Sequence, residues 1–476
     1  MRKHRNVVAA VMVGATMLLS VFVYLPRSFA PLRPASQLPQ DPEETSSPSE
    51  KPHPPPLRPR PASSHCKSMF TIDKEDPDTV WDSDAPYEAL AQRLPPLLGE
   101  MKAMGSKDNI SAQIFLGTRL EPLGGAVPYI PCLVREFGAA ETGECVAARA
   151  ARGASTWIAF VGDSNQRQKV HSFLDFLPRD LAYSYYLGDE QVSLEVFTNE
   201  VIDHKHRPPV FEIIGRPPPP PPPPLLPPPP PDSYVLKVTL VWHTGVKNAS
   251  LPSSSPFPTA FSSSSSSSSS FSSPLPPSVP VEDRLRQWVE EGTVPDVVVV
   301  AFGTWMLLSR EHGDELKPFT ELEEAARLLQ DALTLLAERT TLLFWLQSRY
   351  RWFNDGYSES SRDNNERKGL WKMFLYLNQF GDAIPLVDAW LWRTMRKTGA
   401  WLWDSTLPFN LANLGECRKL SEAGLSTHPF YTGRWWNCFD FHHGAFETNS
   451  VEIQMLLNLL CNAHLDTPRR YCCAGP

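Results

Sequence analysis

The sequence predicts an α/β fold in which a parallel sheet carries helices on both faces, so that the domain has three layers. Two observations support this prediction. Short apolar runs alternate with segments of helical periodicity through much of the chain, and parallel strands are joined by crossovers that are usually helices. Apolar side chains make up 42% of the 476 residues, which is enough to fill the core of one large domain.

The predicted strands and helices follow one another in order along the chain. Residues 157–161 form a continuous apolar run typical of a buried strand, and they lead directly into a helix over residues 165–176. The same criteria predict further strands at 297–301, 341–346 and 383–387, and further helices at 316–338, 362–379 and 448–461. Ligands of such sheets bind beyond the carboxyl ends of the strands, so the segments at those ends are the candidates for a functional site.

The N-terminal part of the chain predicts a membrane anchor and a stem. Residues 7–25 contain no charged side chain, and basic residues precede them. At about 1.5 Å per residue this stretch spans a hydrocarbon layer of roughly 30 Å, and the positive flank keeps residues 1–6 in the cytosol. A cleaved signal peptide is the alternative, because residues 28–30 include the small side chains of a cleavage site. Residues 26–65 are rich in proline and serine, which predicts a disordered stem.

Cysteines and glycosylation sequons agree with a lumenal location for residues 66–476. All eight cysteines follow the predicted anchor, and disulfides persist in that compartment. Their even number permits up to four bridges of open connectivity, and their wide spacing matches no zinc-ligand pattern. Asn109 and Asn248 begin acceptor sequons for N-glycans. We therefore expect a single-pass type II protein of the Golgi or another secretory-pathway membrane.

Low-complexity stretches indicate how the lumenal domain is organised, and the net charge limits the classes of partner it could bind. Residues 216–231 contain an oligoproline run and residues 251–280 a serine run, so we expect both to be surface insertions within the lumenal domain. The formal net charge of −8 offers no extended basic surface to neutralise a phosphate backbone. We therefore expect a membrane contact through residues 7–25 but no nucleic-acid partner.

The first candidate segment lies at the junction of the first strand and its helix. Gly162 allows a tight turn there, and Asp163 and Ser164 would begin the helix. Unpaired amides and the positive end of the helix dipole favour an anion at that position. Ser164 could therefore be a nucleophile whose own amide binds an oxyanion. The alternative is that Asp163 or Ser164 is simply a helix N-cap.

Two further segments could complete such a site. Asp440 and His443 precede the last helix, and an oriented imidazole is what a serine hydroxyl needs to lose its proton. His442 as the base is one alternative, and a metal site at the same cluster is another, although no obvious histidine elsewhere supplies a further ligand. Gly303 follows the strand at 297–301 and is either a second oxyanion donor or a turn glycine.

In combination, these segments resemble the SGNH (GDSL-like) hydrolase superfamily and, within it, the PC-esterase branch. They are most similar to the lumenal domain of sialic-acid O-acetyltransferases. The resemblance is carried by the blocks at residues 160–168, 344–347, 365–367, 440–443 and 456–462. It implies an SGNH-like three-layer fold for the lumenal domain.

The resemblance also implies roles for individual residues. Ser164 would be the nucleophile, His443 the base and Asp440 the carboxylate that orients it. The amides of Ser164 and Gly303 would form part of the oxyanion hole. The residues that would support this site are Asp163, Asn165, Arg167 and Asn365. We expect no metal ion and no bound cofactor.

One departure from the family concerns the oxyanion hole. Plant-type relatives carry an asparagine before the mid-chain glycine, where this chain has Ala301. The candidates to replace it are Asn165 and Asn365. Loss of one oxyanion donor costs about 10²–10³ in rate, so an inactive SGNH-like protein that binds a glycan or lipid is the alternative function.

The expected activity is transfer or hydrolysis of an O-acetyl group on a glycan or glycoconjugate through an acyl-serine. A transferase would need an acetyl donor such as acetyl-CoA. The sialic-acid enzymes continue into a many-helix membrane portion, and this sequence has no second apolar span. A membrane partner that supplies acyl groups is therefore part of the expectation.

Overall fold

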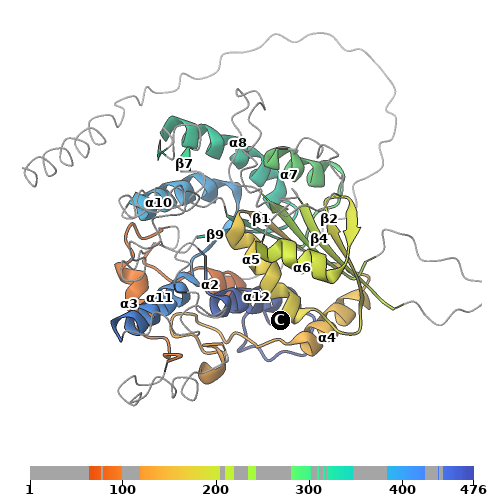
Figure 1. Ribbon diagram of the computed structural model, residues 1–476, viewed down its shortest axis with the longest axis horizontal. Coiled ribbons are helices and arrows are strands. Elements are labelled where there is room, and N and C mark those ends of the chain that lie inside the picture. Colours follow the sequence, from red (N-terminus) through yellow and green to blue (C-terminus); the bar gives the residue numbers. More distant parts are fainter. Residues whose placement is uncertain are drawn as a thin grey trace, which may run out of the picture. The chain divides into compact units, whose positions relative to one another are not determined.

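An eight-stranded mixed sheet organises the part of the chain that the computed structural model describes (Figure 1), with the strand order β10-β9-β6-β1-β5-β4-β2-β3. The structure describes residues 64–76, 79–98, 118–203, 210–218, 234–242, 280–301, 308–309, 315–316, 319–346, 383–423, 438 and 443–475. All of these fall within the compact unit Pro56–Pro476. None of the helices in these ranges is long and apolar enough to cross a membrane. The predicted anchor, both sequons and most of the stem and of the two insertions lie outside the described residues.

Five neighbouring strands of this sheet are parallel, as the sequence predicts. They are β10 (Trp401–Trp403), β9 (Thr341–Trp345), β6 (Val297–Ala301), β1 (Thr156–Gly162) and β5 (Leu236–Trp242). Because the strands run in one direction, their carboxyl ends meet at the same edge of the sheet. Every residue of β1, β6 and β9 is buried, as expected for strands that are covered on both faces.

The prediction of an entirely parallel sheet is wrong at the other edge. The three strands there pair antiparallel, and they are β4 (Val210–Arg216), β2 (Ala182–Leu187) and β3 (Glu190–Val192). A two-residue turn that begins at Gly188 joins β2 to β3, and a connection this short can only form a hairpin. The strand β4 buries every second residue, which is typical of an antiparallel strand with one covered face. A further small sheet pairs β7 (Leu308–Ser309) with β8 (Glu315–Leu316).

Helices cover both faces of the sheet, which confirms the three-layer arrangement (Figure 1). One face carries α7 (Val281–Glu290), α8 (Phe319–Ala337) and α10 (Ala383–Met395). The other carries α2 (Ser64–Phe70), α4 (Ala139–Ala150), α5 (Ser164–Phe173), α6 (Leu194–Asp203) and α12 (Phe446–Cys461). In addition, α3 (Ala85–Ala91) packs on α11 (Leu407–Glu422). Short 3₁₀ turns occupy Glu121–Leu123, Leu174–Phe176 and Arg396–Thr398.

The strand β1 shows how the sequence divides between the two cores. Ile158 and Phe160 point to the face with α5 and α12, while Ala159 and Val161 point to the face with α8. This alternation follows from the two-residue period of a strand. The helix α12 is buried along its whole length, so it is a central element of its layer rather than a surface helix.

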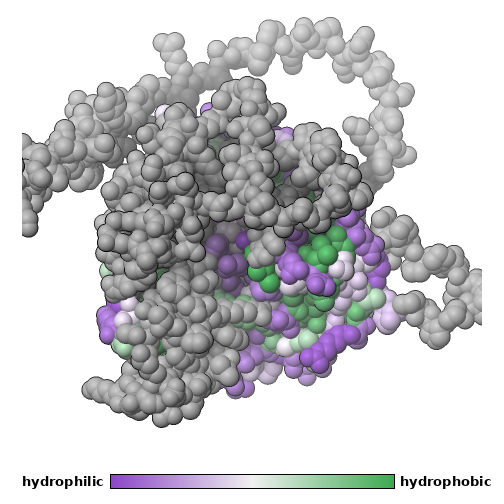
Figure 2. All heavy atoms as spheres, in the orientation of Figure 1, coloured by the Kyte–Doolittle hydropathy of each residue, from purple (hydrophilic) through white to green (hydrophobic). Residues whose placement is uncertain are grey.

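The helix α6 leaves apolar side chains at the surface. Phe197 and Val201 pack inward, whereas Leu194, Val196 and Ile202 remain exposed. Figure 2 shows apolar residues gathered over this part of the face that it draws. Apolar atoms form much of any protein surface, so this patch alone assigns no partner.

Most predicted elements that fall on described residues are confirmed, with one exception. The strands at 157–161, 297–301 and 341–346 are present, and the helices at 316–338 and 448–461 correspond to α8 and α12. The run at 383–387, however, is the first turn of α10 and not a strand. A short apolar run does not distinguish the two structures, and here Ala389, Trp392 and Met395 continue it as a buried helical face. The helix predicted at 362–379 lies outside the described residues.

All eight cysteines form disulfides, and this number of bridges is typical of a secreted or lumenal domain. Three bridges join the first part of the domain to its last residues: Cys66–Cys473, Cys132–Cys472 and Cys145–Cys461. The fourth bridge joins Cys417 of α11 to Cys438, 21 residues further along the chain. The helix α2, which contains Cys66, begins close to the predicted start of the lumenal domain.

Candidate functional site

The carboxyl ends of the central strands form the edge on which the candidate site is built. In the sheet register Gly162 pairs with Trp242 of β5 and with Ala301 of β6, so three strands end side by side. A Cβ atom at Gly162 would lie 2.0 Å from the carbonyl oxygen of Ala301, and the φ of Gly162 is +148°. Only glycine fits this close approach and this backbone conformation. The glycine therefore lets the chain turn at once from β1 into α5.

The N-cap of α5 is Asp163, one of the two residues that the sequence offered for that position. The Asp163 Oδ1 atom accepts a hydrogen bond of 2.9 Å from the backbone N–H of Asn165. Ser164 is the first residue of the helix, and none of the described residues forms a hydrogen bond with its hydroxyl. Its side chain is not entirely enclosed, with a relative exposure of 7%. The cap is thus provided by Asp163 and not by Ser164.

His443 reaches this segment from the far end of the chain. Burial raises the pKa of the Asp163 carboxyl, and the backbone N–H of Asn165, the imidazole of His443 and the ammonium of Lys169 each lower it. The effect of His443 requires that its ring lies near Asp163. The geometry follows from the helices, because His443 comes just before α12, which packs along α5. The structure therefore places His443 close enough to Asp163 for its charge to act on that carboxyl.

The remaining predicted site residues divide into two groups. Asp440, His442, Gly303 and Asn365 lie outside the described residues, so their roles stay predictions. Among the described ones, Asn165 is buried, and its side chain, like its backbone N–H, lowers the pKa of the Asp163 carboxyl.

Arg167 lies one turn after Ser164 on α5. Its guanidinium carbon is 5.3 Å from the centre of the Trp242 ring, at the end of β5. Residues three apart on a helix share a face, so Arg167 and Ser164 lie on the same side of α5. The site therefore combines a hydroxyl, an imidazole and a cation at one strand edge.

A buried polar cluster behind the site was not predicted from the sequence. Lys169 of α5 forms an ion pair of 2.8 Å with Glu452 of α12. The indole N–H of Trp345 donates to Glu452 at 2.8 Å, and the hydroxyl of Thr406 donates to it at 3.0 Å. The Lys169 Nζ atom also lies 3.4 Å from the centre of the Trp345 ring. This cluster joins the two helices to the ends of β9 and β10.

The sequence contained a signal for this cluster. Glu452 lies three and four residues before Met455 and Leu456, which places it on the apolar face of its helix, and Lys169 lies four residues before Phe173. A charged residue on a buried face needs a partner of opposite charge. The pattern thus predicts that each residue is paired, although it cannot say that they pair with each other.

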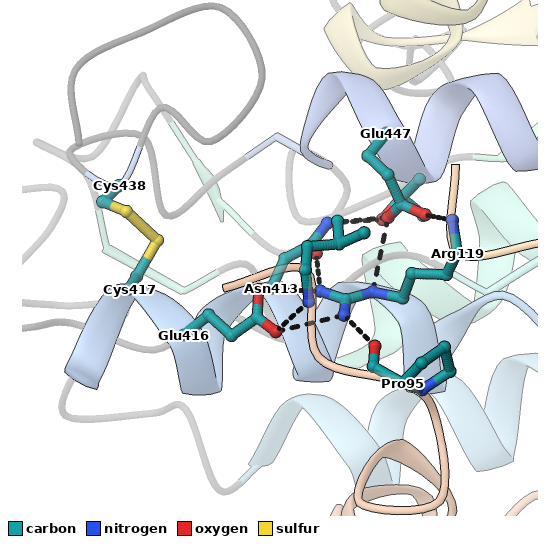
Figure 3. Close-up of polar contacts among 9 residues, drawn as sticks. Pro95, Arg119, Asn413, Glu416, Cys417, Cys438 and Glu447 are labelled. Atoms are coloured by element: carbon teal, nitrogen blue, oxygen red, sulfur yellow. Dashed lines mark hydrogen bonds and ion pairs between the residues drawn. A yellow bond between two sulfur atoms is a disulfide. The ribbon is translucent and has the colours of Figure 1, made fainter. Parts of the chain in front are cut away.

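A second buried charge holds α11 and the start of α12 together (Figure 3). The guanidinium of Arg119 contacts Glu416 of α11 at 3.2 Å and Glu447 of α12 at 3.7 Å, and it also donates to the side chain of Asn413. Cys417, next to Glu416, is bonded to Cys438, a few residues before His443. The helix that follows His443 and a residue just before it are therefore both fixed to α11.

Replacement of Arg119 by methionine should destabilise the protein strongly. Burial raises the pKa of Glu447 and Arg119 lowers it, so the variant leaves two buried carboxylates, Glu416 and Glu447, without their cation. Breaking a buried ion pair on one side costs about 3–5 kcal/mol, which thermal or urea unfolding measures directly. Arg286→Met is the matched control, because the exposed pair with Asp283 contributes at most about 1 kcal/mol. Equal losses for the two variants would contradict the structural role of Arg119.

The described residues bring together groups that can serve acid–base and nucleophilic chemistry. They contain no group of three side chains that could hold a metal ion. No protein-family model, curated protein or solved structure matches this chain. The function is therefore inferred from the site itself and from the sequence blocks that surround it.

Proposed function

We propose that this protein is a serine acyl-ester enzyme of the SGNH type that acts as an O-acetyltransferase or O-acetylesterase on a glycan or glycoconjugate. One observation carries the proposal. Ser164 begins α5 at the end of β1 with its hydroxyl not engaged in capping, and His443 lies near the adjacent Asp163. A hydroxyl at a helix N-terminus with an imidazole close by is the arrangement that acyl transfer needs.

The chemistry would proceed in two steps. His443 accepts the proton of the Ser164 hydroxyl while the oxygen attacks the ester carbonyl, and the negative charge that develops is stabilised by the backbone N–H of Ser164 and the positive end of α5. The alcohol then leaves with the proton from His443, and an acyl-serine remains. A sugar hydroxyl or water next accepts the acyl group. In this proposal Asp440 orients His443, and Gly303 provides a second N–H to the oxyanion hole.

The cellular setting is part of the same proposal. We place the domain in the lumen of the Golgi or another secretory compartment, behind a type II anchor at residues 7–25. The four disulfides favour an oxidising compartment. As a transferase, the protein would use a donor such as acetyl-CoA, with acyl groups supplied by a membrane partner.

An acetyl-ester assay tests the proposal. The purified full chain is incubated with a panel of O-acetylated glycans, with and without an unacetylated sugar acceptor. Release of acetate without an acceptor indicates an esterase, and acetyl transfer to the sugar indicates a transferase. If acetate release, acetyl transfer and labelling by a fluorophosphonate are all absent, the enzymatic proposal is wrong and a glycan- or lipid-binding protein is favoured.

A further inference from the structure

The ion pair between Lys169 and Glu452 is completely enclosed by protein. Neither side chain has any exposed surface, and the two charged atoms are 2.8 Å apart. Transfer of two charges out of water is costly, and replacement of a buried ion pair by neutral side chains of similar volume is often neutral or stabilising. Stability alone therefore does not account for these two charges in the interior.

The position of the pair suggests what it does. Lys169 is in the second turn of α5, the helix that begins with Ser164, and Glu452 is in the second turn of α12, the helix that follows His443. The pair is a direct polar link between the two helices that carry the proposed nucleophile and base. Trp345 and Thr406 fix the Glu452 carboxylate through the hydrogen bonds described above, so the link is held by the strand ends as well.

Lys169 also acts on Asp163. Among the described residues, the charged groups that lower the pKa of the Asp163 carboxyl are His443, from the segment before α12, and Lys169, from α5. Both are attracted to it, while the N–H of Asn165 donates to it from the helix start. The charges of Lys169 and His443 thus both favour the ionised form of Asp163.

We propose that Lys169 and Glu452 are positioning residues of the site, which fix α5 against α12 and present a positive charge to Asp163. The first role sets the distance between Ser164 and His443. The second keeps a carboxylate beside the imidazole that must carry a proton during the reaction. The predicted effect on catalysis rests on the proposed function, whereas the predicted link between α5 and α12 does not.

The variant that tests this proposal is Lys169→Met combined with Glu452→Gln. Glutamine retains the oxygen that accepts from Trp345 and Thr406, and methionine retains most of the volume of lysine, so the charges are removed with little change in packing. We expect a melting temperature within a few degrees of the parent value. We expect kcat and the rate of fluorophosphonate labelling at Ser164 to fall by about 10- to 100-fold with KM nearly unchanged, because misplacement of reacting groups costs that much.

The pH dependence gives a readout that a merely structural role would not change. Lys169 lowers the pKa of Asp163, so its removal raises that pKa and the carboxylate becomes protonated at a higher pH. The acidic limb of the labelling-rate profile should therefore move to higher pH in the double variant. An unchanged limb and an unchanged rate would overturn the proposal.

The ion pair between Arg149 and Asp296 provides a matched control at the opposite edge of the sheet. These side chains are also largely buried, with a distance of 2.9 Å. Arg149, from α4, donates to Thr156 at the start of β1, and Asp296 directly precedes β6. Arg149→Met combined with Asp296→Asn should leave the labelling rate and the acidic limb unchanged, whatever it does to the melting temperature. An equal loss of labelling rate in this control would show that any buried pair has the same effect and would refute a specific role for Lys169 and Glu452.

Hydrogen exchange separates failure of the inference from failure of the proposed function. Amides of α5 and α12 should exchange about tenfold faster in the Lys169→Met/Glu452→Gln variant, while those of β1 and β6 remain unchanged. This measurement needs no turnover, so it decides whether the pair holds the two helices together even if the parent protein proves inactive. Unchanged exchange in α5 would overturn the positioning role.

Discussion

Replacement of Ser164 by alanine should abolish covalent labelling by a fluorophosphonate and reduce acetyl-ester turnover by roughly 10⁴-fold or more. The expected loss is this large because the hydroxyl forms the covalent bond, and the rate that remains comes from binding and the oxyanion donors alone. Intact-protein mass spectrometry measures the labelling, and release of acetate measures the turnover. Of the substitutions considered for this protein, this one should have the largest effect.

The structure explains why this variant should still fold. Asp163, and not Ser164, caps α5, so loss of the serine hydroxyl removes no hydrogen bond from the helix start. Ser172→Ala is the matched control, because Ser172 lies on the same helix, is fully buried and should leave labelling intact. Labelling that persists in the Ser164→Ala protein would remove Ser164 from the mechanism.

The parts of the fold that could be predicted are those for which a single segment of the sequence carries the whole pattern. The strands β1, β6 and β9 are continuous apolar runs because helices cover both of their faces, and the long apolar faces of α8 and α12 show a clear helical period. The strand β2 was missed because none of its residues is fully buried and tyrosines interrupt its apolar pattern. The strand β4 was missed because one of its faces is only partly buried and carries charged residues. Their antiparallel pairing depends on contacts between strands, which no single segment specifies.

The candidate site was likewise predictable only where a single segment of the sequence carries the signal. The turn from β1 into α5 was predicted because a glycine followed by two capping residues is a strong local signal. Which of Asp163 and Ser164 forms the cap could not be predicted, because both residue types favour that position and only the geometry distinguishes them. The pairing of Lys169 with Glu452 depends on how α5 packs on α12, a long-range arrangement that periodicity on either helix does not contain.

His443→Ala should reduce kcat/KM by about 10²–10⁴-fold, whereas His442→Ala should change it by no more than a few fold. A general base contributes a factor of that size, and His443 is the histidine found near Asp163 at the start of α5. Initial rates of acetate release and the rate of fluorophosphonate labelling provide two independent measurements. Both should fall together in the His443 variant, because the base activates the same hydroxyl in each reaction.

The two neighbouring histidines serve as controls for each other. Both substitutions fall just before α12, so an indirect effect on that helix should lower the melting temperature of both variants. Loss of the base, in contrast, should lower kcat/KM in only one of them. If His442→Ala were the inactive protein and His443→Ala retained its rate, the base would be His442. His443 would then act only through its charge near Asp163, and the acidic limb of the pH profile, rather than the maximal rate, would change when it is removed.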